Sequence, residues 1–211
     1  MKFDRRPWAC LILLFSSGVY AAETCSYHSY RWNTKTRQAE DLVNISKPYS
    51  ELKPEEIDSA SGCSVCIEDQ QLIKIGEMPP VYVCKILADE FTWILTSAIA
   101  EGLPIRQLDA YRVGRTRGDV DAEGRRSQFS NHSFGIAIDI NSASNGLYEN
   151  CNEYGEQCVL RRGGEWKPDV NPESISADSL LVELMKESGF KWGGEIAGQQ
   201  KDFMHFSVSG Y

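Results

Sequence analysis

Histidine is scarce in this chain, and two of its three copies lie close in sequence to an acidic residue. His132 precedes Asp139 by seven residues, and Asp202 precedes His205 by three. Two imidazoles and one carboxylate with a fourth position left open are typical of a catalytic zinc site, whereas structural zinc sites have four protein ligands. We therefore predict that His132, Asp139 and His205 bind Zn²⁺. The alternative is that both histidines are ordinary strand residues bonded to the backbone; His28 is incidental.

A carboxylate beside such a metal, but outside its ligand set, is the natural general base. Asp202 lies directly before a predicted last strand at residues 203–209. On that strand His205 alternates with apolar residues, so its side chain is expected to face away from the core. Asp202 is therefore predicted to act on the attacking water.

The strand that carries Asp139 is the clearest in the chain. Over residues 133–140, large apolar side chains alternate with small or polar ones, so one face is apolar and the other has room for a ligand. Simple alternation puts His132 on the wrong face. Convergence with Asp139 requires that the strand start after His132 or bend at Gly135, which glycine permits.

The elements around these residues indicate an α+β fold. Apolar residues recur at helical spacing over 83–101, with Gly102 and Pro104 ending the run, and a second helix is expected at 177–188, with Ser176 as its N-cap and Gly189 at its end. Strands are expected at 71–75, 105–113, 134–140 and 203–209, with loops at 114–131 and 142–175. The second loop is long enough to be functional. We predict a central antiparallel sheet that carries the zinc site on one face and the helices on the other.

The first residues have the pattern of a secretory signal peptide. Lys2, Arg5 and Arg6 precede a short apolar run, and a small-residue site follows, so cleavage is expected after Ala21. The run is too short to span a bilayer well, which disfavours an uncleaved anchor. The protein is therefore predicted to be exported, to the periplasm or out of the cell, with no stable membrane insertion after signal removal.

The cysteines that remain after residues 1–21 are removed are even in number, namely Cys25, Cys63, Cys66, Cys84, Cys151 and Cys158. In an exported chain this indicates disulfides. Cys151 and Cys158 close a short polar loop and form the best local pair. Cys63-Ser-Val-Cys66 also fits half of a zinc site or a redox motif, but no second CxxC is present and export favours structural bridges. The full pairing stays open.

The charge of the chain disfavours nucleic acid as a partner. The net charge is −8, and it becomes −10 without residues 1–21, because 22 basic and 30 acidic residues fall to 19 and 29. An acidic chain without a clustered basic patch repels phosphate backbones. The remaining length suits one domain with a proper core.

Three segments resemble a known family. SNHSFGIAID at 130–139 fits the S-x-H-x-x-G-x-A-x-D pattern of the zinc D-alanyl-D-alanine carboxypeptidases and dipeptidases. GFKWGG followed by KDFMHF resembles the second signature of that family, and AYR at Ala110–Arg112 resembles its arginine-bearing strand. The resemblance covers about residues 104–209. It implies the fold shared with lysostaphin-type peptidases and the hedgehog signalling domain.

The resemblance also implies roles for individual residues. His132, Asp139 and His205 would bind zinc. Asp202 would activate water and later protonate the leaving amine, and Arg112 would stabilise the oxyanion of the tetrahedral intermediate. A surface salt bridge is the alternative for Arg112.

Substrate contacts are implied for Ser130 and for Trp192, although a core position suits a tryptophan equally well. The chain departs from the family pattern after its glycine pair, where it has Glu195 and Ile196 instead of aspartate and tryptophan. Aspartate at 202, where the dipeptidases prefer glutamate, favours carboxypeptidase or endopeptidase relatives.

The predicted function is zinc-dependent hydrolysis of a peptide bond next to a D-amino acid, with peptidoglycan or its stem peptides as the partner. Residues 22–80 would form an irregular, cysteine-stapled N-terminal segment and residues 81–211 the peptidase domain. Two alternatives stay open. One is an endopeptidase that cuts the L-Ala–D-Glu bond or a crosslink, and the other is a non-catalytic wall-binding module with the same fold. The presence of all three ligands and the acid disfavours the latter.

Overall fold

The computed structural model describes residues 24–208, so the predicted signal peptide at 1–21 lies outside the described residues. Over the described range the chain is a mixed α/β structure, mostly sheet with two α-helices. No helix in this range is long and apolar enough to cross a membrane.

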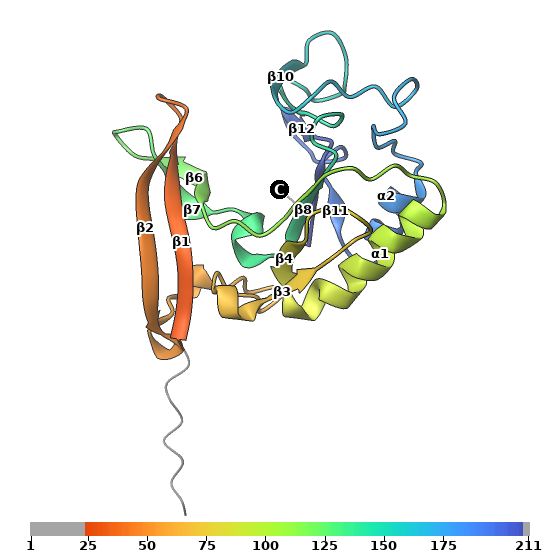
Figure 1. The fold of residues 1–211 in the computed structure, drawn as a ribbon. Coiled ribbons are helices and arrows are strands. Elements are labelled where there is room, and N and C mark those ends of the chain that lie inside the picture. Colours follow the sequence, from red (N-terminus) through yellow and green to blue (C-terminus); the bar gives the residue numbers. More distant parts are fainter. Residues whose placement is uncertain (1–23, 209–211) are drawn as a thin grey trace, which may run out of the picture.

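The N-terminal residues contribute two long strands to a four-stranded sheet and are not the irregular segment that the sequence predicted. In sheet order its strands are β2 (Gln38–Pro48), β1 (Thr24–Asn33), β6 (Arg115–Val120) and β7 (Arg126–Phe129). β1 and β2 make a long antiparallel hairpin, drawn in red and orange in Figure 1. Most of β2 is exposed, so it lacks the apolar alternation that reveals a strand. The predicted loop at 114–131 is also wrong, because it contains β6 and β7, whose side chains are mostly polar or charged.

Disulfides tie this sheet to the rest of the chain. The pairs in the described residues are Cys25–Cys66, Cys63–Cys84 and Cys151–Cys158. The third is the predicted local pair. The two cysteines of the CxxC sequence bind different partners, so the structural interpretation of that sequence is confirmed. Short 3₁₀ turns fill the stapled region: η1 (Tyr49–Glu51), η2 (Pro54–Glu56) and η3 (Ile67–Asp69).

A second four-stranded sheet is antiparallel throughout. Its order is β11 (Lys191–Trp192), β13 (His205–Ser207), β8 (Ala137–Ile140) and β5 (Leu108–Asp109). The strands predicted at 105–113, 134–140 and 203–209 are thus present but shorter. The long strand at 134–140 begins only at Ala137, because the preceding residues form the 3₁₀ turn η5 (Asn131–Phe134).

Both helices share one hydrophobic core with this second sheet. The helices are α1 (Ala88–Ala100) and α2 (Leu180–Glu187), drawn side by side in Figure 1. Phe91 of α1 and Met185 of α2 lie in the same buried cluster as Ile138 and Phe206. Burying such side chains stabilises the fold by about 1.5–3 kcal/mol each.

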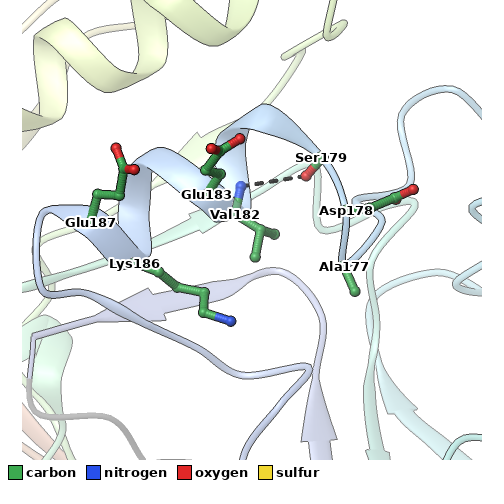
Figure 2. A pocket seen from close by; sticks show the side chains of 7 residues that line it. All are labelled: Ala177, Asp178, Ser179, Val182, Glu183, Lys186 and Glu187. Carbon is green, nitrogen blue, oxygen red and sulfur yellow. Dashed lines mark hydrogen bonds between the residues drawn. The ribbon is translucent and has the colours of Figure 1, made fainter.

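Both helices begin later than predicted. Residues before α1 form β4 (Val81–Cys84), which pairs with β3 (Gln70–Ile73), and then the turn η4 (Lys85–Leu87). The N-cap of α2 is Ser179 rather than Ser176, because its Oγ accepts the Val182 N–H at 3.4 Å, a bond drawn in Figure 2. Ser176 instead bonds the side chain of Asp178.

A third sheet occupies the segment predicted as a loop at 142–175. Its order is β10 (Val159–Arg162), β9 (Leu147–Glu149) and β12 (Gln200–Asp202). The loop prediction is therefore wrong in part, because β9 and β10 lie within it. No apolar alternation marks these strands in the sequence, since all four residues of β10 are exposed and β9 has only three residues. This sheet carries Asp202 at its end.

Candidate metal centre

A tight turn brings His132 towards the strand that carries Asp139. His132 lies in η5, and Gly135 ends that turn with φ +67°, a left-handed conformation that favours glycine. A Cβ at Gly135 would also lie 2.5 Å from the backbone nitrogen of Cys84, which donates to the Gly135 carbonyl at 2.9 Å. The structure therefore contains the irregularity that convergence of His132 and Asp139 required.

Three predicted ligand atoms meet at one point. Oδ1 of Asp139 lies 3.1 Å from His132 Nε2 and 2.9 Å from His205 Nδ1, and the two ring nitrogens are 3.2 Å apart. Asp139 and His205 are direct partners across β8 and β13. All three residues are buried. One ion can therefore be reached by all of them, since their ligand atoms all lie within 4.8 Å of one another.

The charge states of these residues suit a divalent cation. Burial lowers the pKa of His132, although Asp139 opposes it, so the imidazole is neutral. Burial alone would raise the pKa of Asp139, but the hydrogen bonds with His132 and His205 hold it well below the ordinary value. A neutral imidazole and an ionised carboxylate are the forms that bind zinc. The donor set therefore fits Zn²⁺.

Arg112 contacts two of the three predicted ligands. Its Nη2 donates to Asp139 Oδ2 at 2.8 Å, and its Nη1 lies 2.9 Å from His132 Nδ1. The His132 Nδ1 also lies 2.8 Å from the carbonyl oxygen of Ala110. These contacts orient the His132 ring so that its Nε2 points towards Asp139. Arg112 also pairs with Asp109 at 3.3 Å.

Asp202 is a buried carboxylate with an unused oxygen. It is 7% exposed, and among the residues that the structure describes its Oδ1 has no hydrogen-bond partner. Burial raises the pKa of Asp202 to about 6, although the charge of His205 opposes this. Buried polar atoms nearly always have a partner in proteins, so such an atom indicates a missing water, ion or substrate.

Gly193 holds Asp202 and His205 together, and the sequence analysis missed it. Its N–H donates to the His205 carbonyl at 2.8 Å, and its carbonyl accepts the Asp202 N–H at 3.0 Å. A Cβ at this position would lie 2.2 Å from the backbone oxygen of Asp202. The signal was present in the Trp-Gly-Gly sequence, but close backbone approach cannot be seen without the partner strand.

The two predicted substrate contacts differ in position. Ser130 is half-buried directly before η5, and its Oγ lies 3.3 Å from Ser133 Oγ, so it is close to His132 in the chain. Trp192 is 3% exposed, donates from Nε1 to the Phe203 carbonyl at 2.9 Å and packs near Phe206. The structure thus places Trp192 in the core, the alternative that the sequence left open.

A separate pocket lies along the start of α2 and is shown in Figure 2. It is lined by Ala177, Asp178, Ser179, Val182, Glu183, Lys186 and Glu187. It shares no residue with the metal cluster, and its Lys186 is already paired with Glu195 at 2.8 Å. The buried cluster of His132, Asp139 and His205 therefore remains the candidate functional site.

Comparison with known proteins agrees with this geometry. Residues 123–208 match the family model described as D-alanyl-D-alanine carboxypeptidase. The match contains His132, Asp139, Asp202 and His205, and it begins after Arg112. No solved structure matches the chain at a significant level. The resemblance to D-alanyl-D-alanine carboxypeptidases that the sequence motifs predicted is thus confirmed over residues 123–208.

Proposed function

We propose that this protein is an exported zinc peptidase that removes the C-terminal D-alanine from peptidoglycan stem peptides. The observation that carries the proposal is the convergence of His132, Asp139 and His205 beside the buried, partly unsatisfied carboxylate of Asp202. These residues lie within the segment that matches a carboxypeptidase family. The disulfides support an oxidising compartment, which suits a protein that acts on the cell wall.

The metal would be held by His132 Nε2, the Asp139 carboxylate and His205 Nδ1. When bound, zinc polarises a carbonyl oxygen and makes water nucleophilic near neutral pH. Strand alternation supports a site on the sheet face away from the helices. Ile138 and Phe206 pack in the core with α1 and α2, and Asp139 and His205 are their neighbours in sequence, so they point the opposite way.

Asp202 would move the proton. With a pKa of about 6 it is mostly ionised at neutral pH, so it can accept a proton from the attacking water. The same group can then give that proton to the amine that leaves. Its Oδ1 is the atom available for both steps, because it has no hydrogen-bond partner among the described residues. The hydrogen bond from the Asp202 N–H to Gly193 fixes the backbone of this residue.

Arg112 would stabilise negative charge on the carbonyl oxygen of the substrate. Its guanidinium is held by Asp139 and Asp109, so its position is fixed before the substrate arrives. A preorganised cation next to the reacting carbonyl typically contributes about 2.7–4 kcal/mol to lowering the barrier. Ser130, at the start of the turn that carries His132, is proposed to contact the substrate.

The test is zinc content together with product release from stem peptides. The wild type is expected to bind about one zinc per chain and to release D-alanine. Asp202→Ala should keep the metal and lose turnover, whereas His205→Ala should lose both. A wild type that holds no metal and cuts nothing across a panel of stem peptides would refute the proposal. Cleavage inside the stem or at a crosslink would instead identify an endopeptidase.

A further inference from the structure

The third sheet places an arginine in line with Asp202. Leu147 of β9 pairs with Asp202 of β12 on one side and with Arg162 of β10 on the other. Residues directly opposite each other in a sheet point their side chains to the same face, so Asp202 and Arg162 share a face across Leu147. Two strand spacings of about 4.8 Å place their backbones roughly 10 Å apart. Their side chains can therefore approach the two ends of one amino-acid residue lying between them.

Arg162 differs from its neighbour Arg161 in having no internal partner. The Arg161 Nε pairs with Glu149 Oε2 at 2.6 Å. The Arg162 side chain is exposed, and within residues 24–208 its guanidinium forms no ion pair or hydrogen bond. Its charge nevertheless acts on Asp202, since it is among the groups that lower the Asp202 pKa against the effect of burial.

The backbone after β10 is held against the segments that follow β8 and precede β13. A bulge lies between Leu160 and Arg162, and Gly163 follows with φ +76°. The next residue, Gly164, donates its N–H to the Ser142 carbonyl at 2.8 Å. A Cβ at Gly163 would lie 3.1 Å from Cε of Met204, the residue directly before His205. The backbone next to Arg162 therefore lies close to the Met204 side chain, one residue before a predicted ligand. Figure 1 shows β10 and β12 on the same side of β8.

The chemistry of a C-terminal cut requires two groups at this place. The leaving residue has an amine that must take up a proton and, one carbon away, a free carboxylate. Under the proposed function, Asp202 gives a proton to this amine. Arginine binds carboxylates through paired N–H donors, which makes it the usual residue for this task. Arg112 serves the carbonyl oxygen under the proposed function and is held beside Asp139, His132 and Asp109, so the carboxylate requires another cation.

We propose that Arg162 binds the free C-terminal carboxylate of the substrate and thereby makes this protein a carboxypeptidase rather than an endopeptidase. The inference rests on the proposed peptidase function. Glu149 neutralises Arg161, so Arg162 is the cation of β10 that is available for an anionic ligand.

The experiment compares two stem-peptide mimics ending in D-Ala-D-Ala, one with a free C-terminal carboxylate and one with a C-terminal amide. The zinc-loaded wild type should prefer the carboxylate peptide. Arg162→Gln should raise the KM for that peptide about 10- to 100-fold, the loss expected for a charge-assisted hydrogen bond. The KM for the amide peptide should hardly change. Arg161→Gln is the matched control and should keep the preference of the wild type.

A binding measurement separates a substrate contact from an effect through Asp202. In an Asp202→Asn background, adding Arg162→Gln should still weaken calorimetric binding of the carboxylate peptide and not of the amide peptide. Equal losses for both peptides, or a wild type that cuts both equally well, would overturn the role of Arg162 and leave the peptidase function standing. A zinc-loaded wild type that cuts neither peptide would overturn the proposed function itself.

Discussion

Two buried carboxylates in this chain have opposite surroundings. Glu56, in the stapled N-terminal region, is 3% exposed, and Asp202, beside the metal cluster, is 7% exposed. Glu56 accepts hydrogen bonds from the Tyr27 hydroxyl, from Lys47 Nζ at 2.6 Å and from the Lys53 N–H at 2.7 Å. Asp202 has an oxygen with no partner among the described residues.

The pKa values of the two groups follow this difference. Burial alone would raise the pKa of Glu56, but Lys47 and Tyr27 lower it below the ordinary value. Burial raises the pKa of Asp202 to about 6, because too few groups oppose it. A buried carboxylate whose bonds are all satisfied stabilises the fold, whereas one left partly unsatisfied is available for proton transfer. The comparison therefore predicts a stabilising role for Glu56 and, under the proposed function, a proton-transfer role for Asp202.

The largest expected effect is on catalysis at Asp202. Asp202→Asn keeps the shape of the side chain and removes its ability to accept a proton. We expect kcat for stem-peptide cleavage to fall about 10²- to 10⁴-fold, the usual contribution of a general base. Zinc content and thermal stability should stay at or above the wild-type values. An unchanged kcat would show that another group moves the proton.

The convergence of the candidate ligands could be predicted from sequence because their residue types are rare and their spacing is distinctive. His132 lies in the buried turn η5, Asp139 lies within β8, Asp202 ends β12 and His205 begins β13. The bend at Gly135 also followed from the sequence, because alternation alone put His132 on the wrong face. The structure confirms that bend.

Other features could not be predicted, for physical reasons. The strand β2 is mostly exposed on both faces and has no apolar period. The pairings of Cys25 with Cys66 and of Cys63 with Cys84 depend on tertiary contacts that sequence spacing does not encode. The role of Gly193 depends on how closely two backbones approach, and the exposed strand that carries Arg162 gives no period to detect.

The second prediction tests whether backbone placement of Asp202 matters as much as its charge. Gly193→Ala would put a Cβ 2.2 Å from the Asp202 carbonyl oxygen, so the strand must shift. A displacement of about 1 Å in a catalytic group can reduce activity about 10²-fold. We expect a loss of that order in kcat for stem-peptide cleavage. Gly198→Ala, where φ is +96° but a Cβ would meet no atom within 4 Å, is a control for backbone strain without a steric clash. Equal, small losses in both variants would contradict the positioning role.

The third prediction concerns Glu56 and is the opposite of the first: stability should fall while kcat stays unchanged. Glu56→Gln removes the charge that Lys47 pairs with in a site where Lys47 is only 16% exposed. We expect a loss of about 1–3 kcal/mol in the free energy of unfolding, measured by urea denaturation. The kcat of the folded protein should be unchanged. Glu55→Gln, at an exposed position, should have little effect on either quantity. A fall in kcat with Glu56→Gln would contradict the prediction that Glu56 contributes only to stability.

The smallest expected effect is the pH dependence of stability, and its sign differs between the two carboxylates. The folded pKa of Glu56 is lowered, so its contribution to stability is present above its unfolded pKa and is lost as the pH falls through the folded value. The folded pKa of Asp202 is raised from 3.8 to about 6. Its ionised form therefore weakens folding above that pH, and the penalty is relieved as the pH falls from about 6 towards 3.8.

Urea unfolding of chelator-treated protein at several pH values checks both signs. At neutral pH, Asp202→Asn should be more stable than wild type, and this difference should shrink between about pH 7 and pH 5. The deficit of Glu56→Gln should stay constant over that range and shrink only below about pH 4, where the wild-type carboxylate takes up a proton. If the Asp202→Asn difference does not change with pH, the carboxylate of Asp202 has a normal pKa in the metal-free protein. The two carboxylates would then differ in their hydrogen bonds but not in the effect of burial on their pKa values. The proton-transfer role of Asp202 would depend on the metal instead of on burial.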